Sequence, residues 1–154
     1  MKCTVVRPAN LFGAHDKYDF NKCHVTPATI RKVADKMNPI PVWGDGSELR
    51  DLLFIGDFVD ALQVIMENET EMFEVYNVGS NKVYSVLEVL EMMKVIANHD
   101  APTEFISGKP SMIPTRKIDS FKIFDNLGWQ ATTSLEDGLQ NAYEWYLEHN
   151  EEFN

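Results

Sequence analysis

The chain has 154 residues, of which 44% are hydrophobic and 25% charged, and its net charge is −10. This composition is typical of a globular protein and excludes a disordered, collagen-like or low-complexity chain. The acidic charge argues against nucleic acid as the main partner, because phosphate contacts along a duplex need a basic face. A few cations gathered in one cleft can still bind a nucleotide.

The length and the hydrophobic share predict a single domain over residues 1–154. Cys3 and Cys23 have no metal-ligand pair spacing, so both are expected to be reduced thiols of a cytoplasmic protein without a metal site. No apolar run approaches the roughly 20 residues of a membrane span. The N-terminus also lacks the apolar segment of a signal peptide.

A short β-branched strand is expected at residues 3–6, followed by a long loop over 8–24. Thr26 and Pro27 then predict the start of a helix over 27–38, with Thr26 as its N-cap. Long loops in compact domains are often functional, so the segment before this helix is a candidate site region.

The middle of the chain alternates strands and helices. A strand is expected at 42–43 before the turn Gly44-Asp45-Gly46, and another in the apolar run 52–55. Asp57 is predicted to cap the next helix, and a strand follows at 75–78. The strands at 3–6 and 52–55 both have the continuous apolar pattern of strands buried on two faces.

The last third predicts three helices and one strand. Ser85 opens a capping box with Glu88, Ser134-x-x-Asp137 opens the last helix, and a strand is expected at 103–106. Asp119 is predicted to cap a short helix that Gly128 ends, and the acidic tail 148–154 is expected to fray. The alternation indicates an α/β layer fold with four or five helices and four or five strands.

Most active-site signatures are absent from the sequence, including a glycine-rich dinucleotide loop, a P-loop and a zinc-protease motif. Gly44-x-Gly46 is more typical of a tight turn than of a phosphate-binding loop. Tyr18-x-x-x-Lys22 matches the catalytic pair of short-chain dehydrogenases, but it lies in a predicted loop instead of on one helix face. We therefore interpret that match as chance.

Three residues could carry chemistry. His24 stands before a helix start, where it could act as an acid or base or could merely pack in the loop. Trp43 could belong to the core or stack on a nucleobase. Arg50 lies between a glycine-rich turn and a buried strand, where a guanidinium that binds no partner would destabilise the fold.

The other cations have a simpler interpretation. Arg31, Lys32 and Lys36 lie on the polar face of the helix 27–38, with Asp35 placed to pair with Arg31. A second basic cluster, Lys109 with residues 116–117, flanks a Ser/Met/Pro loop, and its side chains are expected to be solvated.

Seven stretches, taken in order, resemble the C-terminal half of the extended short-chain dehydrogenases/reductases that act on nucleotide sugars, the NAD-dependent epimerase/dehydratase family. They are VRPANLFG (6–13), VWGDGS (42–47), RDLLFIGD (50–57), YNVGS (76–80), GKP (108–110), LGW (127–129) and SLEDGL (134–139). The resemblance implies a substrate-binding half with the last strands of a Rossmann-type sheet, a small mixed sheet and four or five helices.

Within that family, His24–Ala28 after Asp16-x-x-Asp19-Phe20 is most similar to the GDP-L-fucose synthases. These enzymes epimerise and then reduce a GDP-4-keto-6-deoxy-mannose with NADPH. The resemblance implies that His24 is the acid/base of the epimerisation. It places the other site residues as follows: Asn10 and Val25 at the substrate, Lys32, Trp43, Arg50 and Lys109 around GDP, and Pro8 and Ala9 near the nicotinamide.

In the family, the dinucleotide loop, the catalytic Ser/Thr, the Tyr-x-x-x-Lys pair and the second acid/base, a Cys, all precede the first shared stretch. The N-terminal dinucleotide-binding domain is therefore expected to be absent from residues 1–154, and NAD or NADP to be bound only by the full-length protein. Two departures stand out: Gly56 replaces a usual acidic residue, and Ser111-Met112 replaces Asp-Gly.

The expected function is the nucleotide-sugar-binding portion of an epimerase/reductase that is inactive as an isolated chain. A nucleotide-diphosphate sugar, with a GDP-sugar favoured, is the expected ligand, and a homo-oligomer through exposed strands is expected. Two alternatives remain open. One is a non-catalytic binding or partner subunit, and the other is the same half of a dehydratase or 4-epimerase for another nucleotide sugar.

Overall fold

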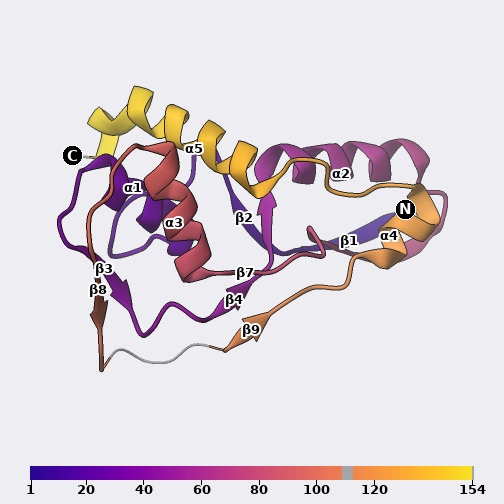
Figure 1. Cartoon of the computed structure of the whole chain (residues 1–154). Helices are drawn as coiled ribbons and strands as arrows, with labels where there is room; N and C mark the ends of the chain where they lie inside the picture. The colour runs from indigo at the N-terminus through magenta and orange to yellow at the C-terminus, as the bar shows by residue number, and fades with distance from the viewer. Residues whose placement is uncertain (109–112, 154) are drawn as a thin grey trace.

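The computed structural model describes residues 1–108 and 113–153, which form five α-helices and four small sheets (Figure 1). The helices are α1 (Val25–Ala34), α2 (Ile55–Asn68), α3 (Val86–Ile96), α4 (Phe121–Leu127) and α5 (Leu135–His149), followed by a 3-10 helix (Asn150–Phe153). The α/β class predicted from the alternation is confirmed.

Three of the sheets are parallel pairs. They join β1 (Cys3–Pro8) to β6 (Phe73–Val78), β2 (Asn10–Phe12) to β5 (Leu52–Phe54), and β3 (Ile40–Trp43) to β8 (Thr103–Ile106). The fourth sheet is the expected mixed one, in which β4 (Leu49–Arg50) lies between antiparallel β7 (Tyr84–Ser85) and parallel β9 (Thr115–Arg116). All four sheets join segments that are far apart in the sequence.

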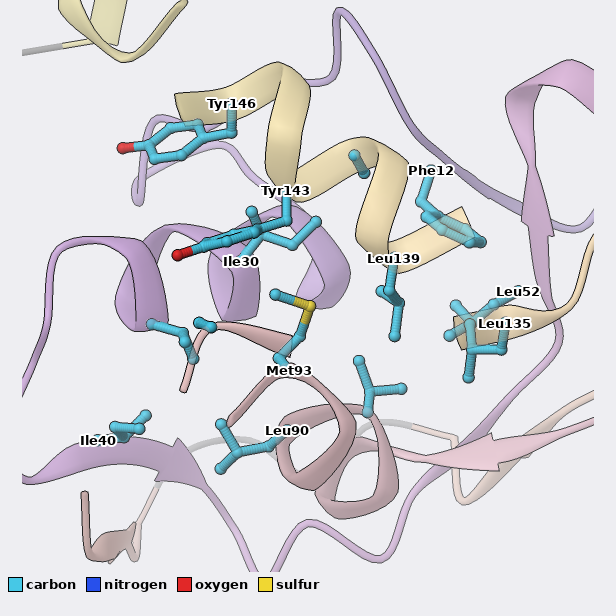
Figure 2. Packing of buried hydrophobic residues seen from close by; sticks show 14 of the residues in the cluster. Phe12, Ile30, Ile40, Leu52, Leu90, Met93, Leu135, Leu139, Tyr143 and Tyr146 are labelled. Atoms are coloured by element: carbon cyan, nitrogen blue, oxygen red, sulfur yellow. The ribbon is translucent and has the colours of Figure 1, made fainter. Parts of the chain in front are cut away.

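The larger core lies where α5 crosses α1 and α3 (Figure 1). Met93 of α3 lies beside Leu90 in the middle of this cluster, and Leu139 and Tyr143 of α5 reach toward it (Figure 2). A second cluster joins α2 and α4 to β6 through Ala61, Ile123 and Tyr76. The first core supports α1 and β3, the two elements that carry most of the predicted site.

Three predicted N-caps, at Thr26, Asp57 and Asp119, are wrong. The helix α1 begins at Val25 with His24 in the N-cap position, so Thr26 lies in its first turn and is buried. The helix α2 begins after Phe54, and Asp57 accepts hydrogen bonds from the N–H of Thr133 at 3.1 Å and its hydroxyl at 3.0 Å. Asp57 therefore ties α2 to the segment before α5 instead of closing its own helix end.

Other helix ends follow the sequence closely. Ser85 forms the complete capping box with Glu88, and the Ser134 hydroxyl accepts the N–H of Asp137 at 3.0 Å. Gly128 ends α4 with φ of 70°, a conformation that glycine adopts without strain. The cap position of α4 belongs to Ser120, although the Asp119 carboxylate accepts the N–H of Phe121.

The predicted frayed tail is wrong for the residues that the structure describes. The helix α5 continues to His149, and the ring of Phe153 lies 5.2 Å from the ring of Tyr18. The helix predicted over 27–38 is shorter than expected, because Ala34 is its last residue and Lys36 turns to φ of 56°.

The two strands predicted to be buried on both faces differ from each other. Leu52 and Leu53 of β5 are buried as expected, whereas Val5 of β1 is 38% exposed. Within residues 1–108 and 113–153, no helix combines the length and the apolar character needed to cross a bilayer.

Candidate functional site

An open cleft of about 800 Å³ is bounded by α1, β3, the turn after β3 and the start of α3. Cavities that hold small ligands measure roughly 300–1,000 Å³. Its floor is apolar, and five of the predicted site residues line it: His24, Val25, Lys32, Trp43 and Arg50. The fold thus gathers residues from a helix cap, a helix, and two strands into one wall.

Lys32 connects α1 to β3. Its Nζ donates a hydrogen bond to the carbonyl oxygen of Pro41 at 2.8 Å, and the side chain lines the cleft. Burial lowers the pKa of Lys32 below the usual lysine value, while the neighbouring Cys23 thiol acts in the opposite direction. The sequence pattern alone placed this lysine on a solvated face, and the structure places it in the cleft wall.

The turn after β3 presents Trp43 at the cleft. Gly44 and Gly46 have φ of 68° and 74°, and the Asp45 carboxylate accepts the N–H of Ser47 at 2.9 Å. The expected tight bend is therefore present. Trp43 is 61% exposed, so it is not part of the core.

Arg50 reaches the cleft from β4. Its Nη1 donates to the carbonyl oxygens of Leu49 at 2.8 Å and Ile113 at 2.9 Å. Both partners are neutral, so the positive charge of the guanidinium is not cancelled by them. A charged guanidinium that is oriented by carbonyl groups is suited to bind an anion.

His24 and Cys23 lie together at the N-terminal end of α1, and both line the cleft. The His24 side chain is exposed and makes no capping hydrogen bond. The Cys23 thiol is half-buried, and this burial raises its pKa. Burial also raises the pKa of Asp16 in the loop before α1, an effect that the N–H of Lys17 and the charge of His24 oppose.

The structure does not bring every predicted residue into the cleft. Asn10 donates its side-chain amide to the Asp51 carbonyl at 2.9 Å, and its N–H bonds to the same oxygen, so it joins β2 to β5. Pro8 and Ala9 lie at the end of β1, away from the cleft lining. Lys109 lies outside the described residues.

The structure gives a non-catalytic explanation for two other sequence patterns, Tyr18-x-x-x-Lys22 and the Arg31–Asp35 spacing. Tyr18 is buried, and its ring contacts Tyr146, whereas the Lys22 side chain is 73% exposed beside Asp19. These two residues therefore do not form a catalytic pair. Arg31 pairs with Asp35 at 3.3 Å, as the helical spacing predicts.

The cleft also contains residues that the sequence analysis did not assign to it. Phe20, Cys23, Asp45 and Glu48 all line it. Cys23 could have been noticed because it directly precedes His24. Glu48 could have been noticed because it stands between the turn and Arg50. Among residues 1–108 and 113–153, no three His, Cys, Asp or Glu side chains could hold a metal ion.

Known proteins resemble this chain over nearly its whole length. A sequence profile of the "NAD dependent epimerase/dehydratase family" matches residues 1–79. A putative GDP-L-fucose synthase 2 of Arabidopsis thaliana is 36% identical over 146 residues, which cover 92% of this chain and 44% of the relative. The GDP-L-fucose synthase of Escherichia coli is 29% identical over 160 residues, which cover 96% of this chain and 50% of the relative.

A solved structure has the same fold. The UDP-glucose 4-epimerase of Thermotoga maritima, in complex with UDP-glucose, superimposes with a TM-score of 0.87 at 25% identity, covering 97% of this chain and 47% of that one. The chain spans about half the length of the curated relatives that it matches.

Proposed function

Because the chain belongs to the NAD dependent epimerase/dehydratase family, we propose that its cleft binds the nucleotide-diphosphate part of a nucleotide sugar, with a GDP-sugar favoured. The observation that carries this proposal is the convergence of Lys32, Arg50 and Trp43 on one cleft. The two cations match the charge of a diphosphate, and the exposed indole offers a face on which a base can stack.

His24 is the proposed proton-transfer group. Epimerisation beside a keto group removes a proton from carbon to leave an enolate, and a proton returned to the opposite face inverts that carbon. An imidazole can perform either transfer near neutral pH. The exposed ring at the cleft edge and the similarity to the GDP-L-fucose synthases support this role for the epimerisation of GDP-4-keto-6-deoxy-mannose.

The family's name implies a nicotinamide cofactor, but the described residues do not fit one. No glycine-rich turn opens a helix in the printed sequence, and such a turn is the usual pyrophosphate site. Pro8 has no N–H to donate, and the N–H of Ala9 is bonded to the Val78 carbonyl at 2.8 Å. We therefore assign to these residues sugar-nucleotide binding and one proton transfer, and no hydride step.

A second candidate is the same portion of an epimerase that acts on another nucleotide sugar. The superposition on the Thermotoga maritima enzyme, which is described with UDP-glucose, favours it. The same cleft in a non-catalytic subunit would bind the same ligand class. Comparing the affinities for GDP and for other nucleotide diphosphates distinguishes the GDP-sugar enzyme from an epimerase for another nucleotide sugar. Turnover by the full-length protein distinguishes both enzymes from a non-catalytic subunit.

Calorimetric titration of the chain with GDP tests the proposal. Because the cleft is open, we expect a Kd of roughly 100 μM, about −5.5 kcal/mol. Arg50→Met and Lys32→Met should each weaken GDP binding at least tenfold, and Arg7→Met, an exposed arginine of β1 outside the cleft lining, serves as the matched control. Equal GDP affinity in the wild type and both cleft variants would contradict the proposal.

A further inference from the structure

Glu48 brings a carboxylate into the same cleft as Lys32 and Arg50. Its backbone carbonyl accepts the N–H of Val86 at 3.2 Å, which fixes the residue at the start of α3. A Cβ added at Gly44 would lie 3.7 Å from the Glu48 Oε1. The carboxylate therefore lies against the turn that directly follows Trp43.

This carboxylate has no hydrogen-bond or ion-pair partner among residues 1–108 and 113–153. Asp45, the other acid of the lining, already accepts the N–H of Ser47 at 2.9 Å. This charge repels the phosphates that the two cations would attract. Hydrogen-bond donors on a ligand would offset that repulsion.

We infer that Glu48 selects guanine among the nucleobases, an inference that rests on the proposed nucleotide-binding function. Guanine presents two adjacent donors on one edge, N1–H and the N2 amino group, and an ionised carboxylate offers two acceptor oxygens. Adenine, uracil and cytosine place an acceptor beside the donor on the corresponding edge, so a carboxylate cannot form the same paired contact with them.

The position of the carboxylate fits this role. Trp43 lines the cleft and is 61% exposed, and the turn joins it directly to the segment that contains Glu48. A base stacked on that indole has its edge close to the turn. A site built to bond specific donors strongly rejects a ligand that lacks them, because its own polar group is then left unpaired. Glu48 is thus a specificity-determining residue, not a catalytic one.

The test measures the Kd values of GDP, IDP, ADP and UDP for the wild type and for Glu48→Gln. Hypoxanthine in IDP keeps N1–H and lacks the N2 amino group. The wild type should bind GDP at least tenfold more tightly than IDP and UDP. Glu48→Gln should lose at least tenfold in GDP affinity and change less than threefold for UDP and ADP. Glu104→Gln, an exposed acid of β8, is the matched control.

The outcomes separate this inference from the proposed function. Equal GDP and IDP affinities in the wild type would overturn base selection while leaving nucleotide binding intact. A uniform loss for all four nucleotides in Glu48→Gln would also overturn it, because a general effect on charge or folding would then explain the variant. If the wild type binds none of the four, the proposed function fails, and this inference fails with it.

Discussion

The buried carboxylate of Asp51 accepts two hydrogen bonds from Ser80, one from the backbone N–H at 2.9 Å and one from the hydroxyl at 2.7 Å. The Asp51 carbonyl also accepts the side chain of Asn10. A Cβ added at Gly79 would lie 2.7 Å from the carboxylate, so a glycine is needed there for the loop to approach. This junction fixes the residue that follows Arg50.

Ser80→Ala should destabilise the fold by ~1–3 kcal/mol, because it removes one donor from a buried charge. The measurement is the free energy of unfolding in urea. Ser107→Ala, an exposed serine in a turn, should stay within about 0.5 kcal/mol of the wild type. If the two variants unfold at the same urea concentration as the wild type, the Asp51 junction does not contribute as argued.

Gly138→Ala should destabilise the contact between α5 and β2. The added Cβ would lie 2.9 Å from the Cζ of Phe12, whose ring is itself buried, so the core must shift at a cost of ~1–3 kcal/mol. Asn141→Ala, on the exposed side of the same helix, is the control and should be neutral or slightly stabilising. Thermal unfolding of both variants checks this prediction.

Lys32 should make folding stability depend on pH in a defined direction. Burial lowers its pKa in the folded chain below the unfolded value of 10.5, so between these two values the unfolded chain binds more protons. The contribution of Lys32 to stability therefore rises with pH across that range. The difference in unfolding free energy between the wild type and Lys32→Met should move in favour of the wild type from pH 7 to pH 10. A difference that does not change with pH would contradict this prediction.

NADPH should not bind to these 154 residues with a Kd below about 10 μM, an affinity that needs roughly −7 kcal/mol of organised contacts. The physical reason is the lack of a glycine-rich turn at a helix N-terminus in the sequence. Calorimetry at pH 7 measures this directly, with GDP as the ligand expected to bind. Tight NADPH binding would show that the described residues form a cofactor site after all.

The chain should form a discrete dimer or larger oligomer at micromolar concentration. Within the part of the chain that the structure describes, β1 pairs only with β6, and Val5 and Phe73 are 38% and 63% exposed. Unpaired strand edges and exposed apolar surface favour association. Light scattering should show a smaller mass for Val5→Glu/Phe73→Glu than for Val95→Glu, which changes an exposed valine of α3. A wild-type mass of 17.6 kDa would refute the expectation.

Local signals predicted much of the fold. The capping box at Ser85, the Ser134 cap and the glycine at 128 depend on residues within one turn, and the structure has all three. Asp57 failed as a cap because its partner, Thr133, is distant in the sequence. The strands β4, β7 and β9 were missed because two residues are too few to show any alternation.

The cleft could be predicted only in part. The resemblance named Lys32, Trp43 and Arg50, and the structure gathers them. Periodicity alone assigned Lys32 to a solvated face. Its hydrogen bond to the Pro41 carbonyl depends on β3 packing beside α1, which the helical pattern does not show. Asn10 was assigned to the substrate, but its side-chain amide is bonded to Asp51, a tertiary contact that the sequence does not show. Its role toward a substrate stays a prediction.

The contact between Tyr18 and Phe153 has a consequence for synthesis on the ribosome. The loop that contains Cys23 and His24 leaves the ribosome well before the aromatic rings that cover Tyr18, which belong to α5 and the 3-10 helix after it. At ≈ 5–20 residues per second, roughly ten seconds separate the two events. The packing around the loop before α1 is therefore completed only when α5 has been made, and until then Tyr18 is open to chaperones and proteases.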